Sequence, residues 1–510
     1  MMRRRGPPGC LLPMPTALTS PSVMPWPSRP SVSPSLSARA SLLEPSPWPP
    51  RSRTSSDPHH PTTAQHEVTE GVPVQSQSNP AKRRRHRRTA VAAIAGASAM
   101  SLLLGACSSS SSAPSGDAAS GGGTASEITA FLIPSPTEEA IKKSLPDCEA
   151  KTGVKVTIVD APYSDAHQKM LLSFQAKQGA YDIVQYDNPY LAPFASQNAL
   201  AELDSYLGKS TAYDIGDFVQ PLQDYSKYDG VTYGLNLSTE PFLLWYRTDI
   251  YDQLGLKVPT TWDEYLANAQ TIQESGLADG QVIANASSVN SWWWLQLLWS
   301  FGGDLQDASG NVTLDTPEAQ KATEFMKSLL AVSPQSATTA TGDDATTLFT
   351  TQDVGQMINY SGYYPVITDP AQSKFVDKIA TASIPKGDTD ITQLTGWNIG
   401  IPADSKAKDS AWAVLECLLG KDNAVKFIEN GAAAIGRTSV VTDPDLTAKY
   451  PYIALLGPAS ETGRRLPALV QWAEVSNQIG VHVQDMLTGK TSVQDGLSSM
   501  QSEVSATLGN

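Results

Sequence analysis

The sequence predicts an α/β fold with a helical tail, and three observations indicate it. Short apolar runs alternate with helical stretches from Glu127 onward, the alternation returns later in the chain, and the C-terminal stretch has a helical period almost throughout. Strands and helices that alternate at this spacing are typical of βαβ units and a largely parallel sheet.

The first βαβ units are expected between residues 128 and 186. Val154–Ile158 alternates with period two, and Tyr181–Tyr186 has the apolar character of a buried strand. The expected elements are strands at 128–132, 154–158 and 181–186 and helices at 137–152 and 166–177.

Later segments repeat the pattern in a chain of 510 residues, which is long enough for two or three domains. Residues 355–359 and 400–401 are expected at the edges of another sheet. Ser410–Leu419 is expected to be a helix, and Leu466–Leu508 is expected to be almost entirely helical.

The charge of the chain is unevenly distributed. Residues 1–88 contain 13 of the 37 Lys and Arg residues but 4 of the 51 Asp and Glu residues, and residues 89–106 carry no charge. From Cys107 onward, 24 basic residues stand against 47 acidic ones. Because nucleic acids and anionic lipids need a positive surface, the acidic body excludes both as partners.

Residues 1–80 are rich in Pro, Ser and Thr and contain no apolar run able to form a core. This composition predicts disorder. The alternative is that the segment is not translated and that the protein begins near Val72 or Val74.

Residues 81–107 have the organisation of a secretory signal. A basic cluster, Lys82–Arg88, precedes the uncharged apolar stretch Thr89–Ala106. The sequence Leu104-Gly105-Ala106-Cys107 resembles the lipobox of bacterial lipoproteins. That resemblance implies a lipid on Cys107 and a place on the extracellular or periplasmic face of the cell membrane.

The Ser- and Gly-rich stretch 108–126 would serve as a flexible tether between this anchor and a folded domain. A transmembrane helix is the alternative to a lipoprotein signal, but an apolar stretch rich in Ala, Gly and Ser spans a bilayer poorly. Arg87-Arg88 leaves the choice between Sec and twin-arginine export open.

Two further cysteines, Cys148 and Cys417, each lie in an expected helix. An exported protein can form a disulfide between them. Two buried thiols are the alternative, because sequence does not reveal whether the two Cα atoms are within bonding range.

The chain carries no recognisable enzyme signature. It has no phosphate-binding G-x-x-x-x-G-K-[ST] loop, no G-x-S-x-G and no H-E-x-x-H, and His482 is the only histidine after His167. No cofactor or metal is therefore expected. Carboxylates are plentiful, so an extracellular glycoside hydrolase is the alternative from a different functional class.

Seven short motifs follow one another in a recognisable order between residues 149 and 490. Each is weak alone, but together they resemble the extracellular solute-binding proteins of family 1, the group that includes maltose-binding protein, over nearly all of Glu127–Asn510. The motifs are Glu149–Val156, Tyr181–Asp204, Tyr233–Asp249, Pro259–Glu264, Gly302-Gly303, Gly396–Pro402 and Leu487–Lys490.

The resemblance implies two α/β lobes joined by a hinge, with a ligand cleft between them. One lobe would comprise 127–238 plus 396–436, and the other 239–395 plus 437–510. A ligand that contacts both lobes favours the closed state, which the permease of an ABC importer would recognise. The protein is expected to act as a monomer.

A sugar site needs aromatic rings for stacking and carboxylates, amides or Arg for the hydroxyl groups. Trp292, Trp293 and Trp294 form the densest aromatic cluster. Because adjacent helical residues point about 100° apart, at least one of the three is expected to leave the core. An aromatic core patch is the alternative.

Three candidate residues follow from the resemblance. Trp397 follows Gly396 at an expected crossing segment, and Tyr363 falls where the family places a ring under the sugar. Glu240 precedes Tyr246 by the spacing at which maltose-binding protein carries a ligand carboxylate; a solvated loop acid is the alternative.

The remaining candidates are five. Tyr186, Asp187 and Asn188 are expected at the carboxyl end of a parallel strand, where open α/β sheets bind ligands. Arg437 is expected either to donate to hydroxyl groups or to form a hinge ion pair, and Trp472 either to line the cleft or to pack inside the helices.

The expected ligand is a sugar, an oligosaccharide or a polyol. Acidic and aromatic side chains would also enclose a cation, so a polyamine or another small solute is the alternative within the same fold.

Overall fold

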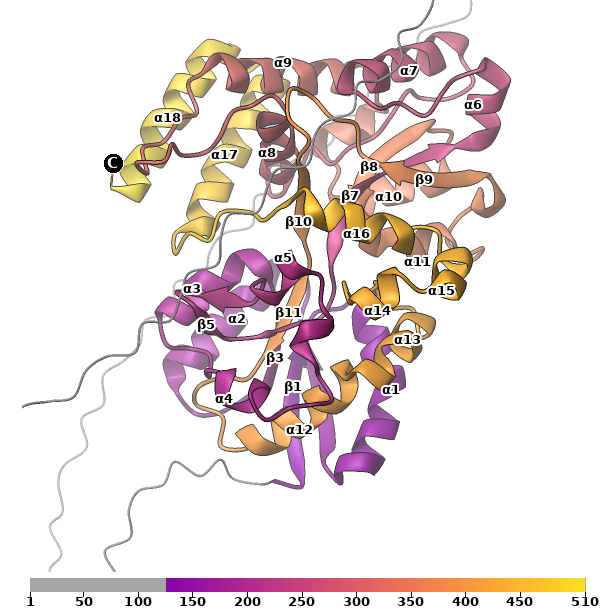
Figure 1. Ribbon diagram of the computed structural model, residues 1–510. Coiled ribbons are helices and arrows are strands. Elements are labelled where there is room, and N and C mark those ends of the chain that lie inside the picture. Colours follow the sequence, from indigo (N-terminus) through magenta and orange to yellow (C-terminus); the bar gives the residue numbers. More distant parts are fainter. Residues whose placement is uncertain (1–124, 510) are drawn as a thin grey trace, which may run out of the picture. The chain divides into compact units, whose positions relative to one another are not determined.

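The computed structural model describes residues 125–509. The N-terminal segment 1–80, the signal peptide with Cys107 and nearly all of the expected tether lie outside the described residues. The α/β fold class is confirmed, since the described chain forms two five-stranded mixed sheets with helices packed against them (Figure 1).

The first sheet has the strand order β2-β1-β3-β11-β6. As expected, β1 (Glu127–Leu132) pairs in parallel with β2 (Lys155–Asp160) and with β3 (Ile183–Asp187). The strand β11 (Trp397–Gly400) runs antiparallel to β3 and to β6 (Leu235–Asn236). The sheet is therefore mixed rather than parallel throughout.

Gly400 was expected at the edge of another sheet, and this expectation is wrong. Gly400 closes β11 and pairs with Val184 in the interior of the first sheet. The chain returns from the second sheet at Gly396, so β11 can enter the first sheet between β3 and β6. Both of these strands come much earlier in the sequence than β11.

The helices α1 (Pro136–Thr152) and α2 (Tyr163–Ala176) connect the first three strands. Ser135 begins α1 by accepting a hydrogen bond from the Glu138 backbone N–H, and Gly153 ends it with φ 72°, a left-handed conformation that suits glycine. Cys148 of α1 and Cys417 of α12 (Lys408–Leu419) form a disulfide, with Cα atoms 5.7 Å apart.

The second sheet has the order β12-β10-β7-β8, and β9 also pairs with β7. The central strand, β7 (Glu240–Arg247), is buried along nearly its whole length. The strand β8, expected at 355–359 and found at Gln356–Tyr360, lies at an edge of this sheet. The other strands are β9 (Ile379–Ser383), β10 (Thr392–Thr395) and β12 (Gly463–Arg464).

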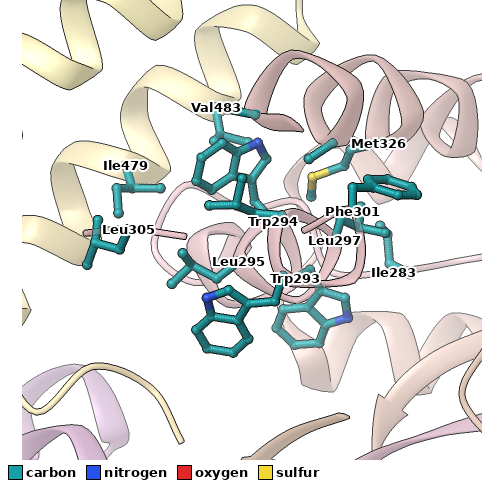
Figure 2. Packing of buried hydrophobic residues seen from close by; sticks show 14 of the residues in the cluster. Ile283, Trp293, Trp294, Leu295, Leu297, Phe301, Leu305, Met326, Ile479 and Val483 are labelled. Carbon is teal, nitrogen blue, oxygen red and sulfur yellow. The ribbon is translucent and has the colours of Figure 1, made fainter. Parts of the chain in front are cut away.

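The expected C-terminal helical stretch consists of α17 (Trp472–Leu487) and α18 (Val493–Leu508). Helix α17 packs against α8 (Asn290–Ser300) and α9 (Pro317–Ala331), and α18 packs against α9. Figure 2 shows the core that these helices share, with Trp294 next to Met326, Ile479 and Val483. The first turns of α8 and α17 also reach the cavity described below.

The chain passes between the two sheets at 237–239, at 395–396 and at 434–437. The first and third passages contact each other: the Thr239 N–H donates to the Ala434 carbonyl at 3.3 Å. The division into two lobes at these passages stays a prediction. The remaining elements are α3 (Leu191–Ser196), α4 (Asp204–Leu207), α5 (Gln220–Gln223), α6 (Thr248–Leu254), α7 (Trp262–Ser275), α10 (Gly342–Thr351), α11 (Tyr364–Ile367), α13 (Lys421–Glu429), α14 (Thr438–Val441), α15 (Pro444–Lys449), α16 (Ile453–Glu461), β4 (Lys227–Tyr228), β5 (Val231–Thr232) and the 3-10 turns η1 (Asn188–Tyr190), η2 (Ile215–Asp217), η3 (Gln335–Thr339), η4 (Ser361–Tyr363) and η5 (Val376–Lys378).

Candidate functional site

A cavity of about 840 Å³ lies between elements of the two sheets, within the size range of small-molecule sites. The carboxyl ends of β3 and β8 open into it, as do the first turns of α1, α2, α8, α10 and α17. Helix N-termini carry partial positive charge and backbone N–H donors, so they suit oxygen-rich groups.

Asp187, the last residue of β3, supplies a buried carboxylate to the wall of this cavity. The Tyr163 hydroxyl donates to Oδ2 at 2.9 Å, and the His167 Nε2 lies 2.6 Å from Oδ1. Tyr163 also lines the cavity and meets the edge of Trp397, with ring centroids 6.1 Å apart.

Glu240, the first residue of β7, supplies a second carboxyl group. Its Oε1 accepts a hydrogen bond from the Ser238 hydroxyl at 2.5 Å, and a Cβ at Gly362 would overlap the carboxyl group. Burial raises the pKa of Glu240 to about 7, although the Ser238 hydrogen bond acts in the opposite direction. Near neutral pH this group is therefore partly protonated and can both donate and accept hydrogen bonds.

The aromatic wall from the second sheet combines β8 with α8. Tyr360 stacks on Phe242 at 4.2 Å between ring centroids, and Trp292 and Trp293 meet Tyr360 edge-on. The Trp293 Nε1 donates to the Ile358 carbonyl at 3.1 Å, which anchors that ring in the core. Trp292 is partly exposed and turns toward the cavity, so the expectation that one of the three indoles leaves the core agrees with its placement.

Tyr363 and Asp343 meet at the same wall. The Tyr363 hydroxyl donates to Asp343 Oδ1 at 2.8 Å, and both residues line the cavity. Gly342 is needed beside them, because a Cβ at this position would lie 2.7 Å from the Tyr363 hydroxyl oxygen. The pair presents a half-buried phenol ring and an exposed carboxylate to the same space.

Trp397 of β11 and Trp472 of α17 also line the cavity. The Trp397 backbone N–H donates to the Ser238 hydroxyl at 3.2 Å, which links this residue to the Glu240 carboxyl through one side chain. Gly396 before it has φ 147° and leaves no room for a Cβ against the Ser238 carbonyl. Trp472 begins α17 and is 1% exposed, so only a small part of its ring is free.

The described residues that line the cavity include three acids, Asp187, Glu240 and Asp343, and no Lys, Arg or His. The electrostatic field of these side chains disfavours an anionic ligand. Uncharged hydroxyl groups and cations remain compatible with the donor and acceptor set.

Two of the candidate residues at the end of β3 lie away from the cavity. Tyr186 is 0% exposed, and its hydroxyl donates to the Tyr233 carbonyl at 3.3 Å. The Asn188 amide donates to the Tyr225 carbonyl at 2.9 Å. The expectation that they line the site is corrected, because their polar atoms are bound to the protein's own backbone.

Trp294 and Arg437 also lie away from the cavity. Trp294 is fully buried, and its Nε1 donates to Thr323 Oγ1 at 2.9 Å. Arg437 is fully buried too, and its guanidinium donates to the carbonyls of Tyr213 and Leu419 and lies 3.4 Å from Asp217. Of the two roles expected for Arg437, the structure therefore has the ion pair.

Three further residues that were not predicted from the sequence also line the cavity: Tyr163, Tyr190 and Asp343. Tyr163 begins the helix that follows β2, and Asp343 lies in the first turn of α10. Their position just after a strand or just inside a helix start was a usable signal, since ligands gather at strand carboxyl ends and helix N-termini.

Two surveys of residues 125–509 bear on alternative functions. No cluster of three or more His, Cys, Asp or Glu side chains in this range is placed to hold a metal ion. Within the same range, no helix has both the length and the apolar character needed to span a membrane.

Residues 134–425 match the family model described as bacterial extracellular solute-binding protein. The chain belongs to this family. It is a solute-binding protein of an ABC transporter and acts outside the cell or in the periplasm. Members bind solutes rather than transform them, so the glycoside hydrolase alternative is set aside.

Similar proteins agree with the family in both sequence and fold. A Brucella abortus protein named only as a binding protein is 27% identical over 368 residues, which is 70% of this chain and 85% of the relative. A solute-binding protein from Agrobacterium radiobacter in complex with ribitol has a TM-score of 0.69 and 25% identity, covering 74% of this chain and 98% of its own.

Maltose-bound MalE3 of T. maritima is 26% identical to this protein and has a TM-score of 0.69. The similarity covers 74% of this chain and 98% of the MalE3 chain. The periplasmic-binding-protein fold expected from the motifs is thus confirmed. The first of these neighbours is described as in complex with ribitol and the second as bound to maltose.

Proposed function

We propose that the protein captures an uncharged sugar, oligosaccharide or polyol in the cavity and delivers it to the permease of an ABC importer. The observation that carries this proposal is the cavity itself, about 840 Å³ in volume, with aromatic rings, three carboxyl groups and no basic side chain among its described lining residues.

Aromatic rings support the proposal because the apolar faces of sugar rings stack on them. Trp397, Trp292 and Tyr363 are all partly exposed and line the cavity. Their rings come from β11 of the first sheet and from α8 and η4 beside the second sheet. A ligand would therefore be contacted from both parts of the fold.

Carboxyl groups support the proposal because they accept hydrogen bonds from hydroxyl groups strongly when ionised. Asp187 supplies such a group from the first sheet and Asp343 from the segment beside the second sheet. Glu240 supplies a third carboxyl group from the first position of β7.

The two lobes, 127–238 with 396–436 and 239–395 with 437–510, would close around the ligand. Contacts to both lobes exist in the closed state alone, so the ligand shifts the population toward closure. The closed form would then dock on the permease. A lipid on Cys107 would hold the protein at the outer face of the membrane while it does so.

A polyamine is a second candidate ligand, and one observation favours it. Asp187, Glu240 and Asp343 line a cavity that also contains tryptophan and tyrosine rings, and such an arrangement can enclose a cation. The two ligand classes are distinguished by direct screening.

A thermal-shift screen of the purified full-length protein against sugars, polyols and polyamines tests the proposal. A ligand that binds the native state raises the melting temperature. We expect a shift with ribitol, maltose or another sugar, a smaller shift in Asp187→Asn, and no product formed. Asp252→Asn, an exposed acid on α6, is the matched control and should respond like the wild type.

A shift with polyamines and with no carbohydrate would replace the sugar by the second candidate. A response that Asp187→Asn leaves unchanged would argue that the ligand binds outside this cavity.

A further inference from the structure

A buried histidine lies directly behind the cavity wall. His167 belongs to α2, one turn after Tyr163, so the two side chains lie on the same face of the helix. It is 8% exposed and is not among the residues that line the cavity. It nevertheless contacts three residues that do: Tyr163, Asp187 and Tyr190.

Each of these contacts restricts a different group. The imidazole stacks on the Tyr190 ring, with centroids 3.5 Å apart and planes 5° from parallel. It meets Tyr163 edge-on at 5.1 Å. Its Nε2 lies 2.6 Å from Asp187 Oδ1, an ion-pair distance.

The Asp187 carboxylate keeps acceptor capacity for a ligand in spite of these partners. An ionised carboxylate has about four lone-pair sites, two on each oxygen. The Tyr163 hydroxyl occupies one site on Oδ2. Within the described part of the chain, Oδ1 faces His167 and is enclosed by the protein. Oδ2 has a second lone-pair site beside the Tyr163 hydrogen bond, which can accept from a ligand.

A buried carboxylate with such spare capacity is costly unless a partner stabilises its charge. His167 is the one basic side chain of the described residues in ion-pair contact with Asp187. Without it, the carboxylate would be free to turn, and this change would misplace the acceptor atoms.

We propose that His167 is a positioning residue for ligand recognition, which holds the Asp187 carboxylate through Oδ1 so that Oδ2 accepts a hydrogen bond from a hydroxyl group of the ligand. This inference rests on the proposed function. It assigns the ligand a hydroxyl group that donates to Asp187 Oδ2, a group that sugars and polyols carry and that polyamines lack. The stack on Tyr190 is secondary in this assignment.

Isothermal titration of the full-length protein with ribitol and with maltose tests the inference. His167→Phe keeps an aromatic ring against Tyr190 but removes Nε2. His167→Gln keeps a nitrogen donor but removes the ring. We expect His167→Phe to weaken Kd roughly 10- to 100-fold, as for a lost hydrogen-bonding partner of a charged group, and His167→Gln to restore most of the affinity.

A double-mutant cycle separates positioning from general damage to the fold. If His167 acts through Asp187, the double variant His167→Phe with Asp187→Asn should bind no more weakly than Asp187→Asn alone, because coupled residues are non-additive. His482→Phe is the matched control. It removes a histidine–carboxylate pair of 2.7 Å with Glu503, outside the cavity, and should leave Kd unchanged.

Additive losses in the cycle, or an unchanged Kd in His167→Phe, would overturn the inference while the proposed function stands. The inference would also be overturned if His167→Phe bound the ligand more tightly than His167→Gln, because the stack on Tyr190 would then be the important contact. If the wild-type protein binds neither ribitol nor maltose and the screen above finds no other sugar or polyol, the proposed function fails and the inference fails with it.

Discussion

The two faces of α8 use the same residue type for different purposes. Trp294 is enclosed between helices (Figure 2). Its Nε1 donates to the Thr323 hydroxyl. Trp292, two residues earlier, is partly exposed and lines the cavity, as Trp397 does on the other sheet. An indole that the protein encloses and satisfies stabilises the fold, whereas one left partly open can contact a ligand.

The same distinction holds for the acids. Asp187 has a basic partner and a phenol donor. Glu240 has one hydroxyl donor, and burial raises its pKa to about 7. The environment, rather than the residue type, therefore decides which partners each acid has and the charge that Glu240 carries into the cavity.

The largest effect is expected at the enclosed indole. Trp294→Ala should lower the free energy of unfolding by about 3–5 kcal/mol, because it leaves a cavity in the core and removes the partner of Thr323. Urea denaturation of the variant and the wild type measures this change. A decrease of less than about 1 kcal/mol in the free energy of unfolding would contradict the assignment of Trp294 to the core.

The next effect is a pH dependence that originates at Glu240. The folded pKa is about 7 and the ordinary value is 4.5. Between these values the folded protein retains a proton that the unfolded chain has lost, so stability falls as the pH rises through this window. The expected loss is about 3 kcal/mol. Urea denaturation at pH 5 and pH 8 should show a steeper fall for the wild type than for Glu240→Gln. Parallel pH curves would contradict the raised pKa.

The smallest effect on stability is expected at the open indole of the first sheet. Trp397→Ala should change the free energy of unfolding by less than about 1 kcal/mol but weaken sugar binding about tenfold through the lost stacking surface. Titration calorimetry and urea denaturation on the same preparation give both values. A large stability loss with unchanged affinity would reverse the comparison with Trp294.

The sequence was enough to predict the fold class, because the apolar period is local and the first βαβ units depend on neighbouring segments. The pairing of β11 between β3 and β6 could not be predicted, since it joins Asn398 to residues more than a hundred positions earlier. The edge position expected for residue 400 failed for this reason.

The sequence was enough to predict which strand end reaches the site. It was not enough to predict which side chains face the cavity. Tyr186 and Asp187 are adjacent on a strand, so their side chains point to opposite faces and only one could face the cavity. Trp294 lies about 200° around the helix from Trp292 and therefore enters the core. His167 was missed because its contact with Asp187 depends on how α2 packs over the end of β3.

A crystal structure with the sugar or polyol that gives the largest thermal shift is the most direct measurement. We expect the ligand in the cavity, with a ring or carbon chain against Trp397 and a hydroxyl group within hydrogen-bond distance of Asp187 Oδ2. A carbohydrate bound elsewhere, or a cavity that accepts a polyamine and no carbohydrate, would contradict the proposed function.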